Sequence, residues 1–588
     1  MRQVSLGALC AVSLASLALA LSMRTPTLAQ GTGPAACPGG DTGVKLPRGF
    51  CATIFADNMG HARHMAVAPN GVVYVNTWSG RYYGRSRPPA GGFLVALRDA
   101  DGDGRAEIVK RFGETPVAGG SGGTGVALFD GALYAEEGDR ILRYALSPGD
   151  IVPSEKPQTV ISGLPLTGDH PMHPFAIDER GNLYLDSGSA TNACQAQNRI
   201  PESPGLVPCR ELETRAGIWR YDARKTDQKF SARERYATGN RNGEGIAIDG
   251  DHIYVTQHGR DQLLENWPKL YTPEQGRDLP AEEVVELKDG ADYGWPECYY
   301  DGVQHKLVLA PEYGGDGGGA VGVCAEKRGP IAAFPAHWAP NDLALYRGRQ
   351  FPAAYDGGFF VAFHGSWNRA PFPQGGYNVV FQPMADGKPK GDYVVFADGF
   401  AGKSKDPGGA AHRPSGLAVG PDGALYVSDD VGGRIWRITF HGDVATTGVE
   451  SAPAAYAQSA GADAGPPEGT NPQAGVEEGR KLPTPQGASD AEVARGERIF
   501  NGQEAGGNCS GCHGANGKGS PLGPDLTRGK WLWADGSLAS IRSVIAKGVS
   551  QPKDFRSPMP PRGGADLSDA DVSAVAAYVW SISRRPGR

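Results

Sequence analysis

The chain has no basic surplus and little cysteine. Its 588 residues carry a formal net charge of −7 with a pI near 6.0, so nothing in the charge suggests a nucleic-acid partner. After the N-terminal stretch, no run is apolar enough to span a bilayer. The sequence contains one C-x-x-C motif and no second one that would complete a zinc site.

What the N-terminus does contain is an export signal. Met1-Arg2 precedes an apolar run from Val4 to Leu21, and small residues at Ala18-Leu19-Ala20 or Thr27-Leu28-Ala29 suit cleavage. We therefore expect a signal peptide over residues 1–29, although the run is also long enough for an uncleaved membrane anchor. The prediction is a protein exported to a bacterial periplasm or secreted.

Six cysteines remain outside the signal and the C-x-x-C motif, and they occur as near neighbours. In an oxidising compartment the simplest interpretation is three local disulfides, although six cysteines allow fifteen connectivities. The proposed pairs are Cys37/Cys51, Cys194/Cys209 and Cys298/Cys324.

The motif Cys509-Ser510-Gly511-Cys512-His513 is typical of covalent c-type haem attachment. Cys509 and Cys512 would bind the haem edge, His513 would ligate the iron, and Met559, held between prolines, suits the second axial position. A capped helical pattern follows Ser489, and a second helix begins near Leu567. Residues 489–584 resemble the small class I cytochromes c, which implies an all-α mono-haem domain over 489–588.

A second pattern recurs from Leu46 to His441. Gly and Pro are abundant, which favours short strands and turns, and six strands share a central aromatic preceded by hairpin-type turns. The strands are 73–75, 133–135, 183–185, 253–255, 359–361 and 425–427. Six such repeats predict a mainly β, six-bladed propeller over residues 37–445. The alternative, a β-sandwich, would be too small for almost four hundred residues.

Polar residues lie next to these strands, where a propeller places its functional loops. Several of them are arginines, and converging guanidinium groups favour a ligand with several carboxylates. The residues are Arg63, Asp169, His170, Arg241, Asn242, Arg369, His412 and Arg413.

Several longer motifs strengthen this prediction. Asp169-His170-Pro171, Arg241-Asn242-Gly243-Glu244-Gly245, Gln257-His258-Gly259-Arg260-Asp261 and His364-Gly365-Ser366-Trp367-Asn368-Arg369 resemble the soluble glucose/sorbosone dehydrogenase family. The resemblance covers residues 46–441. It implies a six-bladed propeller that oxidises sugars with pyrroloquinoline quinone (PQQ) and calcium. This resemblance would also explain the arginines, because PQQ carries three carboxylates.

The resemblance also implies roles for single residues. His170 is the expected general base, with Asp169 beside it to orient and polarise it. Calcium would bind the backbone carbonyls of Gly259 and Arg260, since a hard cation prefers oxygen ligands. The residues expected to bind PQQ are Arg63, Arg241, Asn242, Arg369 and Arg413.

Together these features predict a sugar dehydrogenase that passes electrons from PQQ to its own haem, and from there to a periplasmic or membrane acceptor. A linker of Ala, Gly, Pro and Glu over 446–488 would tether the two domains flexibly. Three alternatives remain. The eight-bladed alcohol dehydrogenases differ in repeat number and in their adjacent Cys-Cys pair. A calcium-dependent lactonase or hydrolase would need metal-binding carboxylates around the channel, and a ligand-binding propeller would not need His170.

One acidic motif stands apart. Asp99-Ala100-Asp101-Gly102-Asp103 imitates the start of a calcium loop, but Lys110 stands where the twelfth-position glutamate is required. We expect an acidic hairpin turn, with a second calcium site as the alternative.

Overall fold

The computed structural model describes residues 37–584, except 38, 78–89, 115–122, 370–371, 406–408, 445–446, 453–481 and short stretches between 501 and 566 (501–503, 506–508, 514–516, 518, 520–522, 556–557 and 566). The predicted signal peptide and residues 453–481 of the predicted linker therefore lie outside the described residues. None of the helices in the described ranges has the length and hydrophobicity needed to cross a bilayer.

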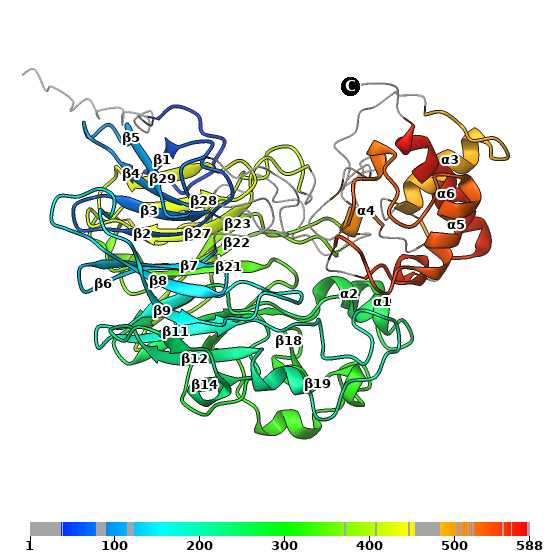
Figure 1. Ribbon diagram of the computed structural model, residues 1–588, viewed down its shortest axis with the longest axis horizontal. Coiled ribbons are helices and arrows are strands. Elements are labelled where there is room, and N and C mark those ends of the chain that lie inside the picture. The colour runs from blue at the N-terminus through cyan, green and yellow to red at the C-terminus, as the bar shows by residue number, and fades with distance from the viewer. Residues whose placement is uncertain are drawn as a thin grey trace, which may run out of the picture. The chain divides into compact units, whose positions relative to one another are not determined.

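Six sheets, each built on four antiparallel strands, form the blades of a propeller (Figure 1). The first three blades are β2 (Ala62–Val67), β3 (Val73–Thr77), β4 (Leu94–Arg98) and β5 (Ile108–Phe112); β6 (Val126–Phe129), β7 (Ala132–Glu137), β8 (Arg140–Ala145) and β9 (Gln158–Ser162), extended by β13 (Gln228–Lys229); and β10 (Phe175–Ile177), β11 (Asn182–Ser187), β12 (Gly217–Asp222) and β14 (Arg235–Thr238).

The other three blades close the ring. They are β15 (Ile246–Asp249), β16 (His252–Gln257), β17 (Glu282–Glu286) and β20 (Ala332–Phe334); β21 (Pro340–Leu345), β22 (Phe359–Phe363), β23 (Asn378–Gln382) and β26 (Val394–Ala397); and β27 (Pro414–Val419), β28 (Leu425–Asp429), β29 (Ile435–Phe440) and β1 (Phe50–Ala56). The N-terminal strand β1 pairs with β29, so the first and last parts of the propeller share one blade. This pairing removes two exposed sheet edges.

The recurring aromatic has a packing role that explains its period. In every blade it lies in the second strand, and it packs into the hydrophobic cluster shared with the next blade: Tyr74, Tyr134, Tyr184, Tyr254, Phe360 and Tyr426. Its neighbours point to the opposite face because side chains alternate along a strand. Val73 and Val75, for example, pack against the preceding blade with Tyr426. The predicted six-bladed propeller is confirmed, and its core lies between the blades.

Smaller elements decorate the ring. The helices α1 (Leu263–Asn266) and α2 (Pro273–Asp278) and the hairpins β18 (Cys298–Asp301)/β19 (Lys306–Leu309) and β24 (Met384–Ala385)/β25 (Lys388–Pro389) fill the loops. The three predicted disulfides, Cys37–Cys51, Cys194–Cys209 and Cys298–Cys324, are all present.

The acidic motif is the turn of the β4–β5 hairpin. Asp99 accepts hydrogen bonds from the backbone of Gly102 and Gly104, and Asp101 accepts one from Asp103. Strand β4 runs antiparallel to β3, and Leu94 at the start of β4 lies opposite Asn76 near the end of β3. The turn after β4 therefore lies at the end of the blade where β3 begins. The predicted hairpin turn is confirmed.

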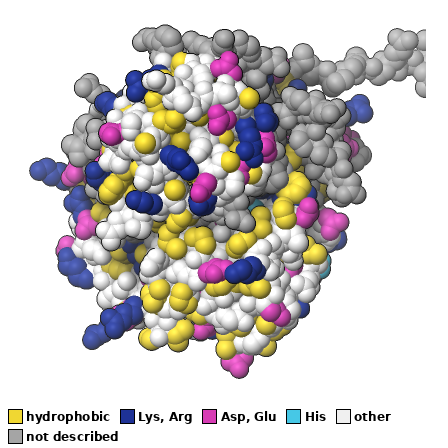
Figure 2. Space-filling view, turned by 90° about the vertical axis from the view of Figure 1, so that its right-hand side faces the viewer, with side chains coloured by type: hydrophobic (Ala, Val, Ile, Leu, Met, Phe, Trp, Pro, Cys, Tyr) yellow, Lys and Arg dark blue, Asp and Glu magenta, His cyan; other side chains and the backbone are white. Residues whose placement is uncertain are grey.

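The C-terminal domain is helical, with α3 (Asp490–Phe500), α4 (Cys509–His513), α5 (Leu538–Lys547) and α6 (Asp569–Ser583). Ser568 and Asp571 form a capping box at the start of α6. Gly496 lets α3 approach α6 closely, since a Cβ there would lie 1.9 Å from the Ala574 carbonyl oxygen. On the face drawn in Figure 2, the basic and acidic side chains of the described residues are interspersed.

Candidate active site

The polar loops converge at one end of the propeller, which we name the mouth. In an antiparallel hairpin the start of the first strand and the end of the second lie together. His170 precedes β10, Arg241 precedes β15 and Arg413 precedes β27, whereas Gly259 follows β16 and Arg369 follows β22. The topology therefore brings the predicted segments to the same end of the ring.

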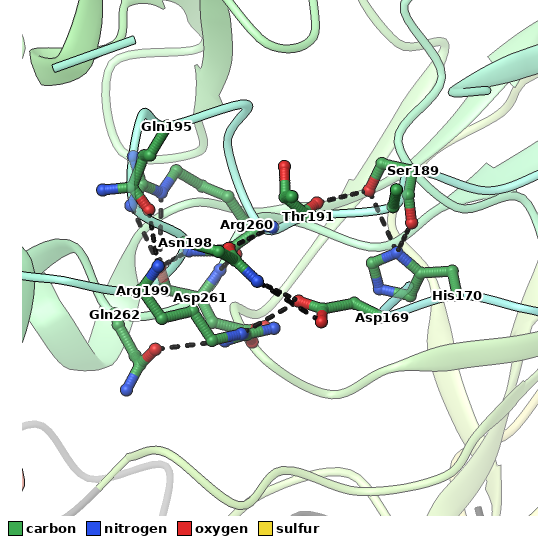
Figure 3. A network of polar contacts seen from close by, with 12 residues as sticks. Asp169, His170, Ser189, Thr191, Gln195, Asn198, Arg199, Arg260, Asp261 and Gln262 are labelled. Carbon is green, nitrogen blue, oxygen red and sulfur yellow. Dashed lines mark hydrogen bonds and ion pairs between the residues drawn. The ribbon is translucent and has the colours of Figure 1, made fainter. Parts of the chain in front are cut away.

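The contacts of His170 fix its tautomer. Its Nδ1 lies 2.9 Å from the Ser189 carbonyl oxygen and 3.0 Å from Ser189 Oγ (Figure 3). The carbonyl can only accept, and the Ser189 hydroxyl donates its own proton to the Thr191 carbonyl at 2.6 Å. Nδ1 must therefore carry the imidazole proton, which leaves the lone pair on Nε2. This is the tautomer that a general base requires.

The surroundings also keep the ring neutral. Burial, followed by the positive charge of Arg241 and the proximity of His258 and Arg199, holds the pKa of His170 well below its ordinary value. Burial likewise lowers the pKa of His258 to about 3. At neutral pH, His170 is thus unprotonated and able to accept a proton.

Asp169 has a different position from the one predicted. Its carboxylate lies 3.0 Å from Arg199 Nε and 3.3 Å from Asn198 Nδ2. Within the described part of the chain, Ser189 rather than Asp169 contacts the His170 ring. The orienting role assigned to Asp169 thus belongs to Ser189, because the Asp169 carboxylate is drawn away by a buried guanidinium.

The guanidinium of Arg241, a predicted cofactor-binding residue, has a partner on each of its three nitrogens. Its Nη2 lies 3.0 Å from Asp261 Oδ2, its Nη1 donates to the Gly259 carbonyl at 3.0 Å, and its Nε donates to the Asn192 carbonyl at 3.1 Å. Although burial opposes ionisation, Arg199 and Arg241 hold the pKa of Asp261 below its ordinary range. Asn368 Nδ2 donates to the other Asp261 oxygen at 3.1 Å. Asp261, which belongs to blade four, therefore contacts Arg199 from blade three and Asn368 from blade five at the mouth.

Asn242 lies beside His170. A Cβ added to Gly188 would lie 2.6 Å from the Cβ of His170 and 2.7 Å from Asn242 Oδ1, so both side chains pack against this glycine. Asn242 Oδ1 is buried and has no hydrogen-bond partner among the described residues. An amide can be turned about its last bond, so this group offers either an acceptor or a donor to a bound ligand.

Two of the predicted arginines have no carboxylate partner among the described ion pairs. Arg413 donates to the carbonyls of His364 and Gly365 at 2.9 and 2.7 Å. Arg369 donates only to backbone carbonyls, including that of Ala336 at 3.0 Å, and burial lowers its pKa to about 10. Shielding a cation from water without an ion-pair partner is costly, so the mouth is suited to a ligand that supplies carboxylates. PQQ meets that requirement.

Arg63 belongs to a second buried network. Its Nη1 lies 2.8 Å from Asp430 Oδ2 and its Nη2 lies 3.0 Å from Glu244 Oε2. His364 Nε2 lies 2.8 Å from the other oxygen of Asp430. The structure thus places the Arg63 guanidinium between two protein carboxylates, and its predicted contact with PQQ stays a prediction.

Replacing Arg63 tests this structural role. We expect Arg63→Met to lower the free energy of unfolding by about 3–5 kcal/mol, because two buried carboxylates lose their common partner. Urea unfolding of the PQQ-free protein, followed by tryptophan fluorescence, measures the change. The control is Lys269→Met, which removes an exposed pair with Glu202 and should leave the stability unchanged. Equal stability of both variants would contradict the structural role.

The predicted calcium ligands are oxygens, as a hard cation requires. The Gly259 carbonyl accepts from Arg241 Nη1 at 3.0 Å, and the Arg260 carbonyl accepts no hydrogen bond among the described residues. The neighbouring Asp261 carboxylate is taken up by Arg199, Arg241 and Asn368. The donors thus fit calcium in chemical type, and the Arg260 side chain is held elsewhere by Glu312.

The predicted haem ligands line one apolar cavity of the C-terminal domain. Its lining includes Cys509, Cys512, His513 and Met559 together with Phe500, Trp531, Ile541, Val544, Ile545, Val575 and Val579. His513 Nδ1 donates to the Pro524 carbonyl at 3.1 Å, which leaves Nε2 to face a metal. Met559 is fixed by backbone pairing with Val549. Two cysteine side chains, an imidazole and a thioether in one apolar cavity fit a c-type haem.

Sequence reasoning missed several residues of the mouth. Asn368 lies in the motif at residues 364–369, but the motif alone assigns no role to this side chain. Ser189, Asn192 and Arg199 lie in or beside a loop closed by Cys194–Cys209, and only the cysteine spacing pointed to that loop. Their importance depends on contacts across blades, which a linear pattern does not show.

The fold and the two sites define a six-bladed propeller with a polar mouth, joined to a haem-type domain. The chain belongs to the TrAA12-like family, which matches residues 44–441, and the cytochrome c family matches residues 493–583. The predicted fusion of a PQQ sugar-dehydrogenase type of propeller with a cytochrome c domain is thereby confirmed.

Individual relatives also match this chain. A PQQ-dependent pyranose dehydrogenase from Coprinopsis cinerea is 31% identical over 233 residues, covering 34% of this chain and 30% of that protein. An uncharacterised protein from Borreliella burgdorferi is 29% identical over 278 residues, covering 46% and 64%. The cbb3-type oxidase subunit FixP from Azorhizobium caulinodans is 42% identical over 81 residues, covering 13% and 26%. The chain thus spans less than two thirds of each of these relatives.

The fold also has solved counterparts. The holo form of the pyranose dehydrogenase PQQ domain from C. cinerea has a TM-score of 0.52 at 20% identity, covering 67% of this chain and 97% of that one. The calcium structure of a family AA12 protein from Trichoderma reesei has the same TM-score at 18% identity, covering 68% and 97%. At this identity the comparison supports the fold alone.

Proposed function

We propose that this protein is a PQQ-dependent dehydrogenase that oxidises a pyranose or a related sugar alcohol or aldehyde and transfers the electrons to its own c-type haem. The observation that carries the proposal is the state of His170, which is buried, neutral and fixed with its lone pair on Nε2. Membership of the TrAA12-like family and the similarity to a pyranose dehydrogenase support the substrate class.

His170 would accept the proton of the substrate hydroxyl at Nε2 while Ser189 holds the opposite nitrogen. Arg413 and Arg369 would bind cofactor carboxylates, and Arg241 and Asn242 would contact the quinone side. When bound, PQQ supplies the acceptor for the carbon-bound hydrogen and its electron pair, and calcium held by the Gly259 and Arg260 carbonyls stabilises the negative charge. Burial of the mouth residues strengthens these interactions by excluding water.

The C-terminal domain supplies the one-electron carrier. Cys509 and Cys512 would hold the haem covalently and His513 and Met559 would bind its iron; a His/Met pair raises the potential relative to two nitrogen ligands. We propose an external periplasmic or membrane protein as the final acceptor. Three disulfides and a c-type haem support export to an oxidising compartment.

Reconstitution tests the proposal. Purified protein carrying haem is combined with PQQ and calcium, a panel of pyranoses is added, and haem reduction is followed spectroscopically. We expect reduction only when sugar, PQQ and calcium are all present. Reduction of an added dye without reduction of the haem would support the dehydrogenase activity but refute electron transfer to the haem of the same chain. Failure to bind PQQ would refute the proposed function.

A further inference from the structure

Blade three carries an insertion at the mouth. Residues 188–216 connect β11 to β12, and the Cys194–Cys209 disulfide closes the loop. Cys194 and Ala216 pack with Trp295 from blade four, and the Trp295 indole donates to the Asn192 carbonyl at 3.0 Å. The insertion is therefore anchored to a neighbouring blade as well as to its own.

Arg199 is the residue that this loop delivers to the mouth. Its side chain is buried, and each of its three nitrogens has a partner (Figure 3). Nε lies 3.0 Å from Asp169 Oδ2, Nη2 lies 3.0 Å from Asp261 Oδ2, and Nη1 donates to Gln262 Oε1 at 3.1 Å. A planar guanidinium with every nitrogen engaged holds its partners in a fixed geometry.

These contacts join the two halves of the site. Asp169 precedes His170 in the chain, whereas Asp261 also binds Arg241 at 3.0 Å. The charges alternate along Asp169, Arg199, Asp261 and Arg241, so the buried cluster sums to zero. Removing Arg199 would leave two carboxylates with a single guanidinium, which a buried cluster does not tolerate without rearrangement.

We propose that Arg199 is a positioning residue for the dehydrogenase reaction. It links the segment that carries His170 to Asp261 and Arg241, and its positive charge faces His170. The Cys194–Cys209 disulfide holds Arg199 in place. The inference rests on the proposed function and concerns a residue that makes no direct contact with the His170 ring in the described structure. It assigns the insertion a role in the chemistry of the site.

The electrostatics of His170 give this role a measurable consequence. The groups that face His170 are Arg241 and His258 from blade four, Arg199 from the insertion, and Arg215, whose Nη1 donates to the His170 carbonyl at 3.1 Å. Burial is the main cause of the lowered pKa of His170, and Arg241, His258 and Arg199 lower it further, in that order. Removing the Arg199 charge also leaves the neighbouring Asp169 carboxylate without its ion-pair partner. Both changes favour the protonated ring, so the pKa of His170 should rise.

The pH dependence of kcat/KM for sugar oxidation by the holoenzyme is the first measurement. Because the base must be unprotonated, activity falls as the pH drops through the pKa of His170. We expect Arg199→Gln to move this acid limb upward by about one pH unit or more. Arg199→Lys keeps the charge and should keep the limb near its wild-type position, although turnover falls. The double variant Asp169→Asn/Arg199→Gln removes both charges of one pair and should shift the limb less than Arg199→Gln.

A second measurement does not depend on turnover. Histidine titration in the PQQ-free protein, followed by NMR and assigned with a His170→Ala spectrum, should show the same upward shift in Arg199→Gln. A shift in the titration without any sugar oxidation by the wild type would retain the electrostatic link and refute the proposed function. An unchanged titration and an equal loss of activity at every pH in both Arg199 variants would overturn the positioning role. If Arg199→Gln does not fold, as judged by circular dichroism, Arg199→Lys and the double variant decide the question.

The disulfide supplies a matched test. Cys194→Ser/Cys209→Ser should reproduce the upward shift of the acid limb because Arg199 is no longer held. Cys37→Ser/Cys51→Ser opens a loop of similar length elsewhere, with a separation of 14 residues against 15, and should leave the limb unmoved. Identical pH profiles for the two double variants would overturn the proposed role of the loop.

Discussion

The His170→Ala variant should lose sugar oxidation almost completely, with kcat/KM reduced by about 10²–10⁴-fold, the contribution typical of a positioned general base. The reason is specific to this ring. Ser189 fixes Nδ1 as the protonated nitrogen, so Nε2 is the one atom of the imidazole that can accept the substrate proton. The variant should still bind PQQ and should retain its haem, because neither depends on the imidazole.

The wild-type enzyme should also stay active below the ordinary imidazole pKa of about 6.5. Burial and nearby positive charge lower the pKa of His170, so the ring remains unprotonated, and kcat/KM remains high, until the pH falls through that lowered value. Initial rates across a pH series with an added dye measure both effects.

The control for this variant is His252→Ala. His252 lies on β16, stacks on Tyr254 and pairs with Glu286 at 2.8 Å, away from the mouth contacts. It should retain wild-type kcat/KM. A loss of less than tenfold in His170→Ala, or an equal loss in His252→Ala, would remove His170 from the role of base.

The fold was predictable because its repeat has one physical cause. An aromatic in the second strand of each blade packs on the next blade, so six local patterns report six equivalent interfaces. The closure of the ring was not predictable in the same way. Strand β1 pairs with β29, which lies almost four hundred residues later, and no local signal encodes that register.

The site was predictable only in part. The segments carrying His170, Arg241 and Asn242 do meet at the mouth, because strand ends in a propeller share one face. The partners of the charged groups were not predictable, since they come from other blades. Arg63 was expected to bind the cofactor, and the structure shows its guanidinium between Glu244 and Asp430. Asp169 was expected to orient His170, and it pairs with Arg199 instead.

The hydrolase alternative finds little support in these contacts. It requires carboxylates at the mouth that are able to hold a metal. Among the described residues, the only group of three or more such ligands is Asp99, Asp101, Asp103 and Glu107. This group lies in the turn at the end of blade one that is opposite the mouth. At the mouth, Asp169 and Asp261 are engaged by Arg199 and Arg241. The pairing of Asp169 and Asp261, and the lack of a carboxylate partner for Arg369 and Arg413 among the described ion pairs, favour an anionic cofactor over a metal hydrolase.

The second large effect concerns the electron path. In Cys509→Ala/Cys512→Ala, covalent haem should be lost entirely, and with it the reduction of an external protein acceptor, because the two thiols are the only attachment points in the motif. Sugar oxidation with a small dye should persist, since the propeller residues that carry the proposed chemistry are unchanged. Haem staining after denaturing electrophoresis, dye reduction and acceptor reduction are measured on the same preparation.

Met559→Ala separates attachment from ligation. The thiols and His513 remain, so the haem stays bound, but the iron loses its thioether ligand and its potential should fall. Dye reduction should match the wild type, whereas acceptor reduction slows because electron transfer depends on the haem potential. If the cysteine variant still reduces the protein acceptor at the wild-type rate, electrons leave the propeller directly, and the haem domain is not the relay.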